Sequence, residues 1–78
     1  MKLNNQAWCL DSGFANRIRQ AREAAGLTRF RVATMIGTCQ EYIYKMECGE
    51  SVPNIKRVAE LADLYGVSID YLCKGVGQ

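Results

Sequence analysis

Residues 27–53 read LTRFRVATMIGTCQEYIYKMECGESVP, and this stretch decides the fold because it contains two short helical patterns separated at Gly37. The spacing leaves room for a turn of only about three to four residues between the two helices. A turn this short places the second helix across the first. The two helices are therefore expected to form a crossed pair, covered by helices from the rest of the chain.

The composition fits one small folded domain, with 78 residues of which 49% are hydrophobic and 23% charged. A net charge of +2 excludes a strong polycation, but the charge is unevenly distributed. Residues 14–45 contain six Lys and Arg against two Asp and Glu, whereas residues 46–78 contain three against five. The basic half contains the crossed helices, which suits a surface that faces phosphate groups.

The four cysteines, Cys9, Cys39, Cys48 and Cys73, include no Cys-x-x-Cys pair, and the sequence has no histidine. A zinc site is therefore not indicated, and no metal or cofactor is expected. Residues 1–12 lack the apolar core of a signal peptide, and no apolar run approaches the about 18 residues that span a membrane. These features predict a cytoplasmic protein with reduced thiols and no membrane segment.

Apolar residues repeat with a helical period from Phe14 to Leu72, and no segment alternates as a strand would. Glycines end four of the expected helices, and Ser12, Thr28 and Ser68 are candidate caps at helix starts; the third helix begins at Thr38 or Cys39. The expected inward residues are Phe14, Ile18, Ala21, Arg22 and Ala25; Val32, Ala33 and Ile36; Ile43, Met46 and Glu47; Ile55, Val58, Ala59, Ala62 and Tyr65, flanked by Leu61 and Leu64; and Ile69 and Leu72. The predicted fold class is all-α, with five short helices around one core. Residues 13–75 form the predicted domain, preceded by an extension over residues 1–12 and followed by a tail over residues 76–78.

The outer face of the third helix carries Gln40, Glu41, Tyr44 and Lys45, which share one side opposite Ile43. These are long polar side chains that can meet the edges of DNA bases. Glutamine pairs with adenine, lysine with guanine, and glutamate accepts from the amino group of cytosine. The pattern therefore favours a helix that reads the major groove, whereas the alternative is an ordinary solvated helix surface.

The run from Phe14 to Gly75 resembles the Cro/cI-type helix-turn-helix regulators, also called the XRE family, over nearly the whole chain. The matching elements are an arginine within residues 17–26, the Gly26–Leu27–Thr28 entry, Ala33, Gly37, residues 40–49, Pro53, Leu61–Ala62 and residues 66–72. The resemblance implies a five-helix, lambda-repressor-like DNA-binding domain. In that fold the helix over about residues 39–48 reads the major groove.

The resemblance also implies roles for single residues. Thr28 and Arg29 match positions that fasten the second helix to a DNA phosphate. The base-reading positions are matched by Gln40, Glu41 and Lys45, and the positions at the rim of the groove by Cys39, Tyr42, Tyr44 and Cys48. Dimer contacts in the family often use the last helix and its flanks, here Tyr71, Leu72, Cys73 and Val76; the segment from Trp8 to Leu10 is the alternative.

Arg22 and Glu47 match a pair that is mostly structural in this family. Both also fall on inward stripes of the helical pattern, where an isolated charge would be costly. We therefore expect an ion pair that ties the first helix to the third; the alternative is two solvated charges.

Three features depart from the family pattern. Arg29–Phe30–Arg31 stands where many members have Gln–Glu–Glu, so positive charge meets the start of the second helix and an apolar side chain replaces a polar one. The loop after Gly49, commonly basic in the family, contains Glu50. Glu41 brings a negative charge into the expected groove.

These observations predict a sequence-specific DNA-binding transcriptional regulator, a repressor that binds a palindromic double-stranded operator as a homodimer. The alternative is a protein-interaction module of the same fold, antitoxin- or coactivator-like, that docks a protein partner through Phe30, Trp8 and Tyr44. An enzyme is not expected, because histidine, a Gly-rich phosphate loop and paired carboxylates in a cleft are all missing.

Overall fold

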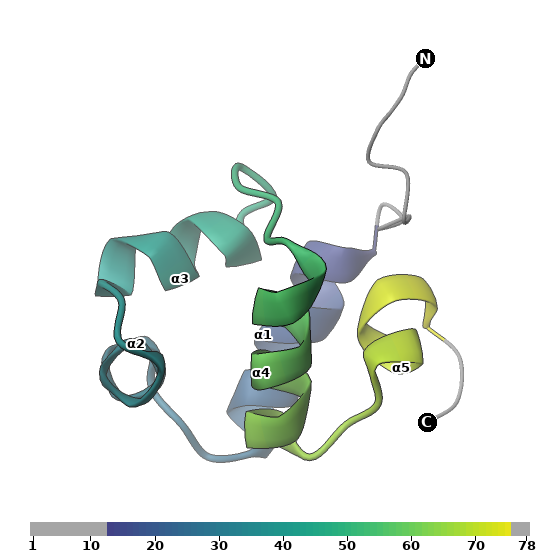
Figure 1. Cartoon of the computed structure of the whole chain (residues 1–78), viewed down its shortest axis with the longest axis horizontal. Coiled ribbons are helices and arrows are strands. Elements are labelled where there is room, and N and C mark those ends of the chain that lie inside the picture. The colour runs from purple at the N-terminus through teal and green to yellow at the C-terminus, as the bar shows by residue number, and fades with distance from the viewer. Residues whose placement is uncertain (1–12, 76–78) are drawn as a thin grey trace.

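The computed structural model describes residues 13–75 and contains, within that range, five helices and no strand. They are α1 (Phe14–Ala24), α2 (Arg29–Ile36), α3 (Gln40–Glu47), α4 (Ile55–Tyr65) and α5 (Ile69–Lys74). The predicted all-α fold class is therefore confirmed. Helix α1 packs against α3, α4 and α5, while α2 packs mainly against α3. The crossed pair thus lies at one side of the molecule and α5 at the other (Figure 1).

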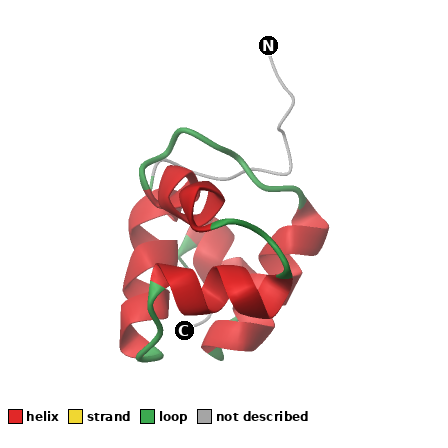
Figure 2. Cartoon of the chain, turned by 90° about the vertical axis from the view of Figure 1, so that its left-hand side faces the viewer, coloured by secondary structure: helices red, strands yellow, loops and turns green. Residues whose placement is uncertain are grey.

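The turn between α2 and α3 depends on Gly37, which has the left-handed φ of 75°. The amide of Thr38 donates to the carbonyl of Ala33 over 2.9 Å, which closes the end of α2 before the chain changes direction. Helix α2 is seen end-on in Figure 1 and lengthwise in Figure 2, and α3 the reverse. The two helices therefore cross steeply, as the short spacing predicts.

Side-chain caps fix the starts of three helices. The side chains of Thr28, Asn54 and Ser68 accept hydrogen bonds from amides three residues later, over 3.0, 2.8 and 2.9 Å. Both Thr28 and Ser68 are confirmed as caps, and Cys39 precedes α3 without a side-chain cap bond. Gly13 occupies the cap position of α1, and the candidate cap Ser12 lies outside the described residues.

The core is built from the predicted inward stripes of the five helices, to which the structure adds Cys73. Its buried hydrophobic residues are Phe14, Ile18, Ala21, Val32, Ala33, Ile43, Met46, Val58, Leu61, Ala62, Tyr65, Leu72 and Cys73. Leu61 is at its centre, with no exposed surface, rather than at the flank of the α4 stripe. Ile36, Ala59 and Leu64 are half-buried.

Three predicted core positions are wrong, and each lies at the end of a helix. Ala25 follows the last residue of α1, while Ile55 and Ile69 are the first residues of α4 and α5. Ala25 is exposed, and Ile55 and Ile69 are 49% and 37% exposed. Helical periodicity predicts which side of the helix a side chain is on. At a helix end, however, no neighbouring helix covers that side, so the side chain is exposed.

No helix among the described residues is long and apolar enough to cross a membrane. The predicted extension, including Trp8 and Leu10, and the tail from Val76 lie outside the described residues. The domain boundaries expected from the sequence therefore remain a prediction.

Replacing Gly37 with Ala should lower the free energy of unfolding by about 1–2 kcal/mol, because alanine is strained at positive φ. A Cβ atom added at Gly37 meets nothing within 4 Å, so the cost is conformational rather than steric. Gly37→Asn is the matched variant, since asparagine tolerates this conformation better. Urea unfolding measures both. Equal losses for the two variants would contradict the conformational explanation.

Candidate nucleic-acid interface

Helix α3 has one face in the core and one face in solvent. Ile43 and Met46 are each 1% exposed and Glu47 is also buried. On the other side, Gln40, Glu41, Tyr44 and Lys45 are all exposed. The structure therefore places the four predicted base-reading side chains together on the free face of α3.

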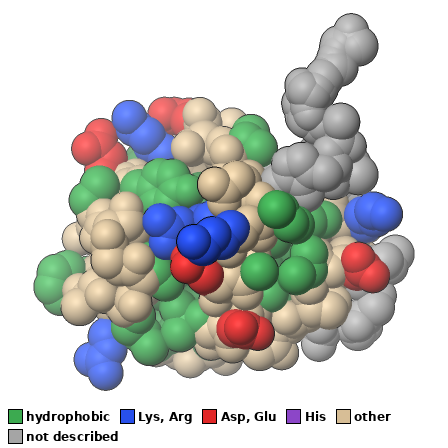
Figure 3. Space-filling view, in the orientation of Figure 1, with side chains coloured by type: hydrophobic (Ala, Val, Ile, Leu, Met, Phe, Trp, Pro, Cys, Tyr) green, Lys and Arg blue, Asp and Glu red, His purple; other side chains and the backbone are tan. Residues whose placement is uncertain are grey.

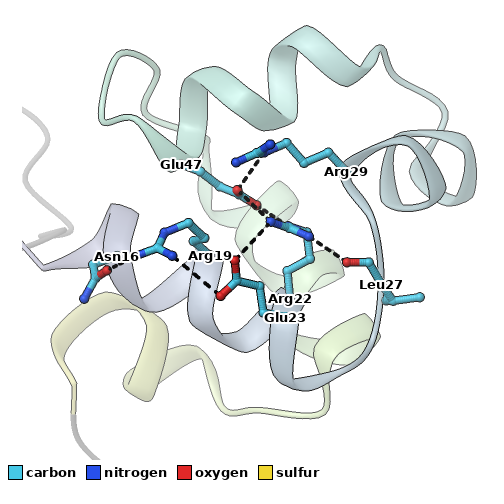
Figure 4. Close-up of polar contacts among 7 residues, drawn as sticks. All are labelled: Asn16, Arg19, Arg22, Glu23, Leu27, Arg29 and Glu47. Carbon is cyan, nitrogen blue, oxygen red and sulfur yellow. Dashed lines mark hydrogen bonds and ion pairs between the residues drawn. The ribbon is translucent and has the colours of Figure 1, made fainter.

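The inner face of α3 is held by a buried ionic cluster at Glu47, called here the Glu47 clamp and formed by Arg22, Arg29 and Glu47 (Figure 4). Arg22 Nε donates to Glu47 Oε2 over 2.7 Å, and Arg22 Nη2 donates to Oε1 over 3.2 Å. Arg29 Nε donates to the same Oε1 over 3.0 Å. The Glu47 side chain is only 2% exposed, so its charge is balanced by arginines rather than by water.

The clamp also fixes the turn that enters α2. Arg22 Nη1 donates to the carbonyl oxygen of Leu27 over 2.6 Å. The hydrogen bond to Glu47 raises the pKa of Arg22 against the opposing effect of burial. Burial raises the pKa of the nearby Tyr65, and the charge of Glu47 adds to that rise. One arginine of α1 thus joins α3 to the turn between α1 and α2.

Arg29 has a second contact, because its guanidinium lies over the ring of Tyr44, with Cζ 5.3 Å from the ring centroid. The neighbouring side chain of Cys48 is the main cause of a raised pKa at Tyr44. The family resemblance implies a phosphate contact for Arg29. The structure shows that the same side chain also supports Tyr44 on the free face of α3.

Glu41 and Lys45 form an ion pair along α3, with 3.5 Å between Oε2 and Nζ. Their side chains are 73% and 48% exposed, so the pair contributes little to stability and is easily broken. In the free protein the pair balances the negative charge of Glu41. Both side chains keep the freedom to turn toward base edges.

The residues expected to contact phosphate or the rim of the groove differ in how exposed they are. Thr28 is exposed at the start of α2, and Cys39 and Cys48 are exposed at the two ends of α3. Tyr42 is half-buried and packs against the core. Glu50, in the loop that departs from the family pattern, is also exposed.

The residues expected at a dimer contact are not equally accessible. Leu72 has no exposed surface and Cys73 is also buried, because both pack inside the core of their own chain. Tyr71 is half-buried, and Val76 lies outside the described residues. The helical pattern of the sequence places Leu72 among the inward residues, and the structure confirms that placement.

Arg57 is a residue that sequence reasoning missed. Its guanidinium lies over the ring of Tyr42, with Cζ 5.7 Å from the centroid, although Arg57 comes from α4. The only signal in the sequence is a polar side chain one position before the buried Val58, which does not reveal its partner. The described residues also contain no group of acidic, Cys or His side chains able to hold a metal ion.

The crossed helices, with one helix clamped from within and free on its outer side, define a helix-turn-helix domain. The helix-turn-helix family model matches residues 18–72, and the chain belongs to this family, within the XRE group of DNA-binding transcriptional regulators. Such regulators are generally not enzymes.

Two relatives match most of this chain. One is an SPbeta prophage-derived uncharacterized HTH-type transcriptional regulator, YonR, of Bacillus subtilis (strain 168), 32% identical over 62 residues, which are 80% of this chain and 57% of the relative. The other is the glutamine–fructose-6-phosphate aminotransferase (isomerizing) of Methanocaldococcus jannaschii, 38% identical over 63 residues, or 78% of this chain and 6% of that enzyme. The chain thus spans little more than half of the regulator and a small part of the enzyme.

Replacing Glu47 with Gln should lower the free energy of unfolding by about 3–5 kcal/mol, because two arginines lose their buried counter-charge. The matched control is Glu23→Gln, since Glu23 lies 3.8 Å from Arg22 but is 53% exposed. The control should change stability by less than about 1 kcal/mol. Urea unfolding compares the two variants, and similar losses would show that the clamp is not a main support of the fold.

Proposed function

We propose that this chain is a sequence-specific regulator that represses transcription by binding a palindromic double-stranded DNA operator as a homodimer, with α3 in the major groove. The observation that carries this proposal is the division of α3. Its inner face is clamped through Glu47, which is only 2% exposed at the side chain, and its outer face presents four side chains to solvent. A rigid helix with a free polar face meets the geometric need of base reading.

The chemistry of the free face suggests which bases are read. Gln40 suits adenine through a bidentate pair, and Lys45 suits the acceptors of guanine. Glu41 suits the amino group of cytosine, which would also replace its ion pair with Lys45. Gln40 and Glu41 lie in the first turn of α3, the end of a reading helix that contributes most base contacts.

Contacts to the DNA backbone would come from the start of α2. The first amides of α2 form an anion-binding end, and the Thr28 hydroxyl accepts from the Arg31 amide. Arg29 uses its Nε on Glu47, which leaves its outer N–H groups for a phosphate. Cys39, Tyr42, Tyr44 and Cys48 would contact the rim of the groove. This basic end supports a contact with the DNA backbone.

A homodimer supports this function because a single short helix reads only a few base pairs. Leu72 is buried in the core of its own chain and is not available for a contact between copies. We therefore propose that Tyr71, together with Val76, forms this contact. Two copies related by a two-fold axis would place two α3 helices on two half-sites of the operator.

Base reading predicts that Gln40→Ala and Lys45→Ala each weaken binding to the preferred sequence by about 1–3 kcal/mol. The preferred sequence is obtained by selection from a random DNA pool, and binding is measured by fluorescence anisotropy. Gln20→Ala, an exposed position on α1, is the matched control. If both α3 variants bind like the parent while remaining folded, α3 does not read the operator.

The homodimer predicts that Tyr71→Ala shifts the sedimentation coefficient toward that of the monomer at micromolar concentration. Phe30→Ala serves as the control, because Phe30 is an exposed aromatic residue on α2, away from α5. A dimer that persists in Tyr71→Ala would reject this contact, and a dimer lost only in Phe30→Ala would move the contact to α2.

A second candidate function, a protein-interaction module, is favoured by apolar exposure on α2. Phe30 and Met35 are 66% and 52% exposed. Met35, Ile36 and Leu64 line a groove that Glu60 and Asp63 border, and hydrophobic and acidic side chains lie together on this face in Figure 3. Binding to random DNA separates the two functions: affinity that falls steeply with salt supports the regulator, and no detectable affinity at low salt supports the module.

A further inference from the structure

Arg57 makes three contacts, two of which join separate parts of the helix-turn-helix motif. Its Nη1 donates to the carbonyl oxygen of Ile36 over 3.3 Å and to Glu60 Oε1 over 2.7 Å. Its guanidinium also lies over the Tyr42 ring. Ile36 is the last residue of α2, and Tyr42 lies in the first turn of α3. A single side chain of α4 therefore touches both sides of the turn.

The contacts with Ile36 and Tyr42 each have a physical reason. The last carbonyl groups of a helix have no partner within the helix, and a cation there also suits the helix dipole. Arg57 supplies both to Ile36. A planar guanidinium can donate at its edge while its face lies on an aromatic ring, which an ammonium cannot do in the same way.

The position of Arg57 complements that of the Glu47 clamp. Glu47 is the last residue of α3, so the clamp holds the C-terminal end of this helix. Tyr42 is close to the N-terminal end, beside Gln40 and Glu41. A helix held at one end can pivot about it, and the displacement is then largest at the other end, where the proposed base contacts are concentrated.

We propose that Arg57 is a positioning residue for sequence-specific DNA recognition, which sets the first turn of α3 through Tyr42 and the Ile36 carbonyl. This inference rests on the proposed function and adds to it a specificity-determining residue outside the helix-turn-helix pair. Arg57 need not touch DNA in this role. Its effect is on discrimination between sequences rather than on attraction to phosphate.

The test compares Arg57→Lys with the parent on the selected sequence and on random duplex DNA. Lysine keeps the positive charge, but its ammonium cannot lie flat on the Tyr42 ring while it donates to the Ile36 carbonyl. We expect the ratio of specific to random affinity to fall on the order of 5-fold, with little change in random affinity or in its salt dependence. Glu60→Gln, which removes only the exposed ion pair of Arg57, is the matched control and should keep the ratio.

A double-mutant cycle with Tyr42→Leu identifies the route. If Arg57 acts through the ring, Arg57→Lys should reduce the ratio less in the Tyr42→Leu background than in the parent. An unchanged ratio in Arg57→Lys, or a lower melting temperature alone, would overturn the inference. A parent that selects no sequence from the random pool would instead reject the proposed function, so the two failures are distinguishable.

Discussion

The burial of the Glu47 carboxylate is the constraint on which the rest of the structure depends. A carboxylate that is 2% exposed is tolerated only with opposite charge and hydrogen bonds around it. Arg22 of α1 and Arg29 of α2 supply them from two directions. Helices α1, α2 and α3 must therefore meet at Glu47. Arg22 also donates to the Leu27 carbonyl, which holds the turn between α1 and α2 close to the same place.

This constraint explains how so short a helix as α3 can be stable in the folded domain. Helix α3 has eight residues and no side-chain cap at its start, and an isolated helix of that length is marginal in water. Its order must come from tertiary contacts, namely the buried Ile43 and Met46 and the charge network at Glu47. Because all of these lie on the inner face, the outer face needs no structural side chains.

Much of the fold could be predicted from the sequence because it is encoded locally. The five helical stretches, the Thr28 cap and the left-handed Gly37 each depend on near neighbours in the chain, and the structure confirms them. The exposure of Ile55 and Ile69 could not be predicted, since it depends on where packing stops. The contact between Arg57 and Tyr42 likewise depends on how α3 and α4 pack together. The spacing of residues along the sequence gives no information about it.

Arg29 illustrates how such an unpredicted contact changes the meaning of a departure from the family pattern. A positive charge at the start of a helix opposes the helix dipole by about 0.3–1 kcal/mol. A hydrogen bond to a charged group contributes about 1.5–3 kcal/mol, and partial exposure of Arg29 (34%) reduces that figure without removing it. The bond to Glu47 and the stacking on Tyr44 therefore outweigh the dipole. In the proposed complex, a phosphate at Arg29 would contact the same guanidinium that supports α3, so backbone binding and the placement of the reading face would be coupled.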